Sequence, residues 1–115
     1  MFLLAVIFGE FIAFALTGMV IHQVSLMSAL ATPEFANPGS PEKIMADQFM
    51  EQFGRNFRSF GHGALHGAIS GVVLFLPVIG MQAMFERKSW KYILVHTGFW
   101  TVCAIIMGGL ICAFA

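Results

Sequence analysis

The side chains best suited to chemistry in this sequence are four histidines and one acid that lie in or beside long apolar stretches. His62 and His66 are four residues apart, so both imidazoles project from one face of a helix. This spacing suits two ligands to one metal ion, and His22 on a facing helix would add a third ligand or complete a bis-imidazole haem site. The alternative is that the three imidazoles form hydrogen bonds between helices or to water at the lipid headgroups.

Glu10 and His96 are a second candidate pair of polar residues. Glu10 lies about 13 Å along the first expected helix, where an ionised carboxylate is costly unless it is paired or faces water. His96 follows the last charged segment and is the best-placed partner. We expect such a pair to be a buried structural contact that fixes the register of two helices, with a proton relay as the alternative.

Small residues recur at helical spacing in the second half of the chain. The first stripe consists of Gly63, Gly67 and Gly71, with Ala64 and Ala68 alongside, and the second consists of Thr97, Thr101, Ala104 and Gly108. Small side chains let two helix backbones approach closely inside a membrane. The two stripes therefore predict tight helix packing, either within the chain or with a partner.

The composition indicates which elements must carry these residues. Of the 115 residues, 58% are hydrophobic and only 10% are charged, against about 25% charged in soluble domains. Three charge-free runs, 11–33, 59–85 and 92–115, contain 23, 27 and 24 residues, and about 20 apolar residues cross a bilayer as a helix. The sequence therefore predicts an all-α integral membrane protein. A formal net charge of zero and the lack of a phosphate-binding loop exclude nucleic acid as a partner.

The expected organisation is one membrane domain, residues 1–115, with three spans and one helix between the first two. The first span is expected at about 2–30 and ends at Thr32-Pro33, because proline disfavours helix at the residue before it. We expect it to be retained, since no basic residue precedes it as in a signal peptide. Ser40-Pro41-Glu42 predicts the start of an amphipathic, interfacial helix at about 41–59. The other spans are expected at about 61–85, with a kink at Pro77, and at about 92–114.

The charged segments predict the orientation in a bacterial inner membrane. The hairpin 86–92 carries three positive charges and one negative charge, whereas the segment 32–59 carries three positive and four negative charges. The excess of positive charge places the hairpin in the cytoplasm, the segment 32–59 outside, Met1 inside and Ala115 outside. His22, His62 and His66 then share the outer side. Cys103 and Cys112, nine residues apart, lie on opposite helix faces, too distant for a disulfide.

Several segments resemble one bacterial membrane-protein family. They are Ile21-His22-Gln23, the stretch FRSFGHGALHG at 57–67, the hairpin FERKSWKY at 85–92, and His96-Thr97-Gly98-Phe99-Trp100. The family is the one catalogued as domain of unknown function 1761, and the resemblance covers nearly the whole chain. It implies a small polytopic membrane protein and supplies no reaction and no catalytic residues. Members usually have a further helix upstream, which is absent from this sequence. Three explanations are open: a start codon placed too late, a partial chain, or a natural three-helix form.

Three functions are consistent with these features. The leading expectation is a non-catalytic accessory or structural subunit that packs against other transmembrane subunits, in a hetero-complex or a homo-oligomer, within membrane lipid. The second is a subunit of a respiratory or photosynthetic complex in which His22, His62 and His66 bind haem, a chlorophyll-type pigment or a metal. The third is a small oligomeric transporter that uses Glu10 and His96. No enzyme is expected, because neither a nucleophile and base pair nor a complete metal triad is evident in the sequence.

Overall fold

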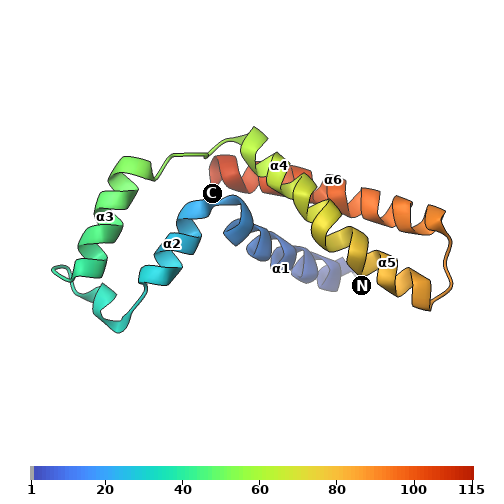
Figure 1. Cartoon of the computed structure of the whole chain (residues 1–115), viewed down its shortest axis with the longest axis horizontal. Helices are drawn as coiled ribbons and strands as arrows, with labels where there is room; N and C mark the ends of the chain where they lie inside the picture. Colours follow the sequence, from blue (N-terminus) through green and yellow to red (C-terminus); the bar gives the residue numbers. More distant parts are fainter. Residues whose placement is uncertain (1) are drawn as a thin grey trace.

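The computed structural model describes residues 2–115, and all the regular elements of that part of the chain are helices (Figure 1). Met1, which the charge pattern assigns to the cytoplasm, lies outside the described residues. The elements in chain order are α1 (Phe2–Val20), α2 (His22–Leu30), η1 (Pro33–Ala36), α3 (Pro41–Phe53), α4 (Phe60–Ser70), η2 (Gly71–Phe75), α5 (Leu76–Phe85) and α6 (Trp90–Phe114).

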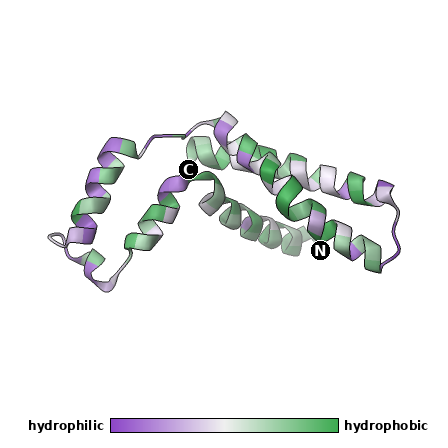
Figure 2. Ribbon diagram, in the orientation of Figure 1, coloured by the Kyte–Doolittle hydropathy of each residue, from purple (hydrophilic) through white to green (hydrophobic). Residues whose placement is uncertain are grey.

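Three helical stretches, 2–20, 60–85 and 90–114, are long and apolar enough to cross a membrane, as the charge-free runs predict. Figure 2 shows hydrophobic residues over most of these spans, with hydrophilic residues frequent in α3 and at the hairpin between α5 and α6. The N-terminal end of α1 lies toward that hairpin, and the C-terminus lies beside the junction of α1 and α2 (Figure 1). The helices α2 and α3 extend away from the three spans as an arm.

The prediction of one continuous helix over 2–30 is wrong. The helix breaks at Ile21, whose backbone is extended with φ −107° and ψ 96°, and α2 leaves in a new direction (Figure 1). A helix of 29 residues would be about 43 Å long, whereas the 19 residues of α1 span about 28 Å, close to the hydrocarbon thickness of a bilayer. Val20 and Ile21 are buried beside Cys112, so the packed end of α1 is held in the bundle.

The helix that follows starts where the sequence predicts and ends earlier. The Ser40 hydroxyl accepts a hydrogen bond from the Lys43 amide, and Pro41 occupies the first turn, as expected of an N-terminal cap. However, α3 ends at Phe53 and not at residue 59. Residues 54–59 form an irregular segment in which Phe57 adopts a positive φ of 60°, a conformation that ends helical continuity.

The second span is helical from Phe60 to Phe85, and the disturbance expected at Pro77 takes the form of a π turn, η2. In this turn the Leu76 amide donates to the Gly71 carbonyl, five residues back. Proline lacks an amide hydrogen, and its ring clashes with the carbonyl four residues earlier in an α-helix. The wider π turn immediately before Pro77 relieves that clash.

The two stripes of small residues meet each other between α4 and α6. A Cβ atom at Gly63 would collide with the Gly108 carbonyl, and one at Gly67 would collide with the Ala104 carbonyl. One turn further along, a Cβ atom at Gly71 would collide with the Thr101 side chain. Gly63, Gly67 and Gly71 therefore pack against the second stripe within the chain.

Thr97, the remaining member of the second stripe, has no glycine opposite it. Its hydroxyl is buried without a hydrogen-bond partner among residues 2–115. The helix α1 packs against both α6 and α4 and completes the bundle, whereas α3 packs mainly against α2 and η1. The end of the bundle at which α1 breaks is thus where the arm, α4 and the end of α6 come together.

Candidate metal centre

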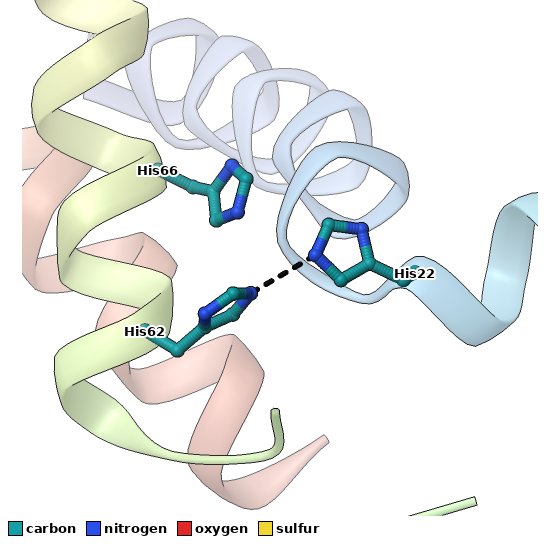
Figure 3. Close-up of side chains that lie close together, drawn as sticks. All are labelled: His22, His62 and His66. Atoms are coloured by element: carbon teal, nitrogen blue, oxygen red, sulfur yellow. Dashed lines mark hydrogen bonds between the residues drawn. The ribbon is translucent and has the colours of Figure 1, made fainter. Parts of the chain in front are cut away.

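The break after α1 brings His22 to the first turn of α4, where it faces His62 and His66 (Figure 3). One ring nitrogen from each of the three histidines lies within 4.8 Å of the others. The Nε2 atoms of His22 and His62 are 3.0 Å apart and share a hydrogen bond. Ring centroids are 4.6 Å apart for His62 and His66, and 5.1 Å for His22 with either of them. His22 is exposed and the other two rings are half-buried.

His22 is positioned by the residues on either side of it. Ile21 is buried on its N-terminal side, and the adjacent Val20 carbonyl lies 3.5 Å from the Cys112 sulfur. On its C-terminal side, the buried Gln23 amide donates hydrogen bonds to the backbone carbonyls of Phe53 and Asn56, at 2.9 and 3.0 Å. These contacts hold the start of α2 between the end of α6 and the end of α3.

His62 and His66 are positioned by the start of α4. Ser59 caps this helix by accepting a hydrogen bond from the His62 amide at 3.2 Å. Just before the cap, the Arg58 side chain donates through Nε to the Cys112 carbonyl at 2.8 Å, and the Cys112 sulfur lies 3.1 Å from the Phe57 carbonyl. The end of α6 thereby fixes the segment that leads into the histidine helix.

Phe57 forms an aromatic wall beside the centre. Its ring centroid lies 5.2 Å from that of His62 and 6.0 Å from that of His22. The positive φ of Phe57 is uncommon for a residue with a bulky side chain and stores backbone strain, which persists where surrounding contacts enforce it. The strained residue is thus the one that covers two of the three imidazoles.

The geometry fits a single transition-metal ion better than a haem. Zinc binds histidine nitrogens at about 2.0–2.1 Å, so the nitrogens of a tetrahedral site lie about 3.3 Å apart. The observed spacing, with 3.0 Å between two Nε2 atoms and 4.8 Å as the upper limit, brackets that value. A porphyrin would need a clear plane between two axial imidazoles, and here the third ring occupies the same small volume. The cluster offers three imidazole nitrogen donors and leaves a fourth position for another ligand.

Other candidate residues from the sequence lie apart from this centre. Glu10 and His96 are both exposed, and neither a hydrogen bond nor an ion pair joins them in the part of the chain that the structure describes. His96 instead packs on Tyr92, with ring centroids 4.1 Å apart. The structure therefore does not form the buried polar pair that the sequence led us to expect.

Gln23, Phe57 and Cys112 contribute to the centre and were not singled out as functional by the sequence. Cys112 and Cys103 are both free thiols, in agreement with their spacing on one helix. Gln23 could have been identified from the sequence as a candidate, because it is an amide beside a histidine at the end of an apolar run. Its acceptors, the carbonyls of Phe53 and Asn56, are 30 and 33 residues away and follow only from the tertiary arrangement.

Comparison with known proteins agrees with the resemblance seen in the sequence. No curated protein and no solved structure matches the chain. The model of one family, described as "Protein of unknown function (DUF1761)", matches residues 1–112, a range that includes the three spans almost entirely and all three histidines. The chain belongs to this DUF1761 family of proteins of unknown function.

Proposed function

We propose that this protein is a small membrane subunit that binds one transition-metal ion through His22, His62 and His66. The observation that carries the proposal is the convergence of three imidazole nitrogens within 4.8 Å, from two elements 40 residues apart in sequence. The pair His62 and His66 alone would follow from helical spacing. His22 joins them only because α1 breaks at Ile21.

A metal ion accounts for the cluster more fully than hydrogen bonding does. The hydrogen bond between His22 and His62 satisfies one nitrogen of each ring. The imidazole of His66 makes no hydrogen bond within residues 2–115, although it lies in the same cluster. One cation at the centre would use a lone pair from all three rings.

The donor set favours zinc, copper, nickel or iron, the metals that imidazole suits, over magnesium or calcium, which prefer oxygen ligands. Structural zinc sites have four protein ligands, whereas sites that bind a further molecule have three. The proposed centre is therefore one that holds an exchangeable fourth ligand. We propose binding and not catalysis, since the cluster formed within residues 2–115 consists of histidines, with no Cys, Asp or Glu among its members.

The membrane setting supports a role as an accessory subunit in a larger complex. Apolar side chains cover the outer face of α1, where Phe8, Phe11 and Phe14 are more than half exposed. Such faces fit contact with lipid or with helices of other subunits. Because the Gly and Ala stripes are used between α4 and α6, a partner would pack on α1 and not on those stripes. We further propose the bacterial inner membrane as the location, with the hairpin 86–92 in the cytoplasm and α3 in the outer interface.

Metal analysis of the purified protein tests the proposal. The full chain, stripped with a chelator and reloaded with Co²⁺ in mild detergent, is expected to bind one ion and to show the absorption bands of nitrogen-ligated cobalt. His66→Ala is expected to weaken binding at least about 100-fold, since even second-shell changes cost 10–100-fold. His96→Ala is the matched control, because His96 lies outside the cluster. Absence of binding, or equal losses in both variants, would contradict the proposal.

A further inference from the structure

A groove opens beside the metal centre and shares His22 with it. Its volume is about 400 Å³, and it is lined by His22, Gln23, Phe49, Phe53, Asn56 and Phe57. These residues come from the start of α2, the last turns of α3 and the segment before α4. Phe57 packs on His62 and His22 and also lines the groove, so it borders both the groove and the centre. The volume is within the range of about 300–1,000 Å³ typical of small-molecule sites.

The charge of the proposed centre determines the head group that would complete it. Three neutral imidazoles leave the double charge of a divalent cation uncompensated. Neither the cluster nor the groove includes an Asp or Glu among the residues that the structure describes there. Asp47, an acid of α3, pairs instead with Lys43 on its own helix. An anionic ligand is thus complementary to the metal in its fourth position.

The apolar lining of the groove indicates which chemical group would be attached to the anionic head group. Three phenylalanines line it, and the rings of Phe49 and Phe53 pack together with centroids 5.3 Å apart. The donor atoms of Gln23 are already used by the carbonyls of Phe53 and Asn56. The elements that carry these residues, α2, α3 and the segment before α4, meet the spans at one end of the bundle (Figure 1). An alkyl chain would bury apolar surface there, as it does in the adjoining lipid.

We propose, on the basis of the proposed metal centre, that the groove binds an amphipathic carboxylate of medium chain length. Its carboxylate occupies the open coordination position next to His22, and its alkyl chain lies along Phe49, Phe53 and Phe57. Phe57, whose positive φ stores backbone strain, borders both the metal centre and the groove, and such strain clusters at binding sites.

The test uses the full chain loaded with Co²⁺ in nanodiscs of zwitterionic lipid. Decanoate, acetate and decanol are titrated separately, and the cobalt absorption bands report changes in coordination. Decanoate is expected to shift the bands at a concentration about 100-fold lower than acetate, because the chain adds apolar burial to the same head group. Decanol, which lacks the anionic head group, is expected to leave the bands unchanged.

A matched pair of variants separates the groove from simple partition of decanoate into lipid. Phe53→Ala removes a groove wall while keeping the backbone carbonyl that Gln23 binds. It is expected to raise the decanoate concentration required about 10-fold, with the acetate response and Co²⁺ binding unchanged. Phe35→Ala, in η1 and outside the groove, is expected to change none of these.

The outcomes distinguish the two proposals. Failure of the unmodified chain to bind Co²⁺ would overturn both the metal centre and the ligand. Co²⁺ binding with equal responses to decanoate and acetate would overturn the ligand alone, as would equal behaviour of Phe53→Ala and Phe35→Ala.

Discussion

At the residue scale, the close packing of the bundle depends on glycines, which have no side chain. Gly63, Gly67 and Gly71 face backbone or a β-branched side chain on α6, and none has room for a methyl group. In a membrane, burial of apolar surface drives helix association weakly, so close packing contributes a larger share. The same contacts fix the end of α6 beside Phe57 and Arg58, and thereby the start of the histidine helix.

Gly67→Ala is expected to destabilise the bundle by about 1–3 kcal/mol, because the new methyl group meets the Ala104 backbone and the helices must separate. The midpoint of unfolding in a titration of mixed micelles with sodium dodecyl sulfate measures the effect. Gly80→Ala is the control, since Gly80 has open space around it in the same span. Equal midpoints for the two variants would contradict this account of the packing.

The sequence predicts residues well where the relation between them is local. The pairing of His62 with His66 and the two stripes follow from helical spacing, and the structure places them together. Gln23, Phe57 and Cys112 act through backbone carbonyls or rings far along the chain, and residue type alone does not identify such partners. The expected contact of Glu10 with His96 assumed that isolated polar residues in spans must find each other, yet both remain exposed.

At the element scale, the residues at which the helices begin and end determine the geometry of the histidine cluster. Charge-free runs predict three spans, but the run 11–33 extends well past Ile21 and does not indicate a break there. The break turns α2 away from the bundle and directs His22 toward α4 (Figure 3). The early end of α3 at Phe53 likewise exposes carbonyls for Gln23. Both features depend on tertiary contacts, which the hydrophobic periodicity of the sequence does not predict.

Gln23 is expected to act as the link between α2 and the end of α3. Gln23→Leu removes both donated hydrogen bonds and leaves the carbonyls of Phe53 and Asn56 without these donors, at a cost of about 1–3 kcal/mol. Hydrogen exchange followed by mass spectrometry is expected to be faster in residues 54–59 and unchanged in the spans. The affinity for Co²⁺ is expected to fall about 10-fold, as for other contacts that orient a ligand.

Gln48→Leu provides the comparison for that variant. Gln48 is exposed on α3 and makes no hydrogen bond through its side chain within residues 2–115. Its replacement is expected to leave exchange in residues 54–59 and cobalt affinity as they are in the unmodified protein. If the two leucine variants behave alike, the start of α2 is not held by Gln23.

At the scale of the whole molecule, the protein has two ends with different chemistry. The hairpin end carries Arg87, Lys88, Lys91 and the exposed aromatic Trp90, whereas the opposite end carries the three-histidine cluster and the arm formed by α2 and α3 (Figure 1). The principal extents are 58 × 28 × 26 Å, so the long axis exceeds the roughly 30 Å hydrocarbon core of a bilayer. In the orientation that we propose, the centre lies near the membrane surface, where ions and amphipathic molecules both have access.

The orientation of this long axis can be tested with single cysteines and a membrane-impermeant maleimide. Glu51→Cys on α3 and Lys91→Cys at the start of α6 are both exposed positions at opposite ends of the molecule. With the basic hairpin in the cytoplasm, the cysteine at 51 is expected to be labelled in intact spheroplasts and that at 91 only after permeabilisation. The unmodified chain is the background, because Cys112 is buried and Cys103 lies half-buried within a span. The reverse pattern would place the metal centre on the cytoplasmic side, and labelling of both positions in intact spheroplasts would rule out a single orientation.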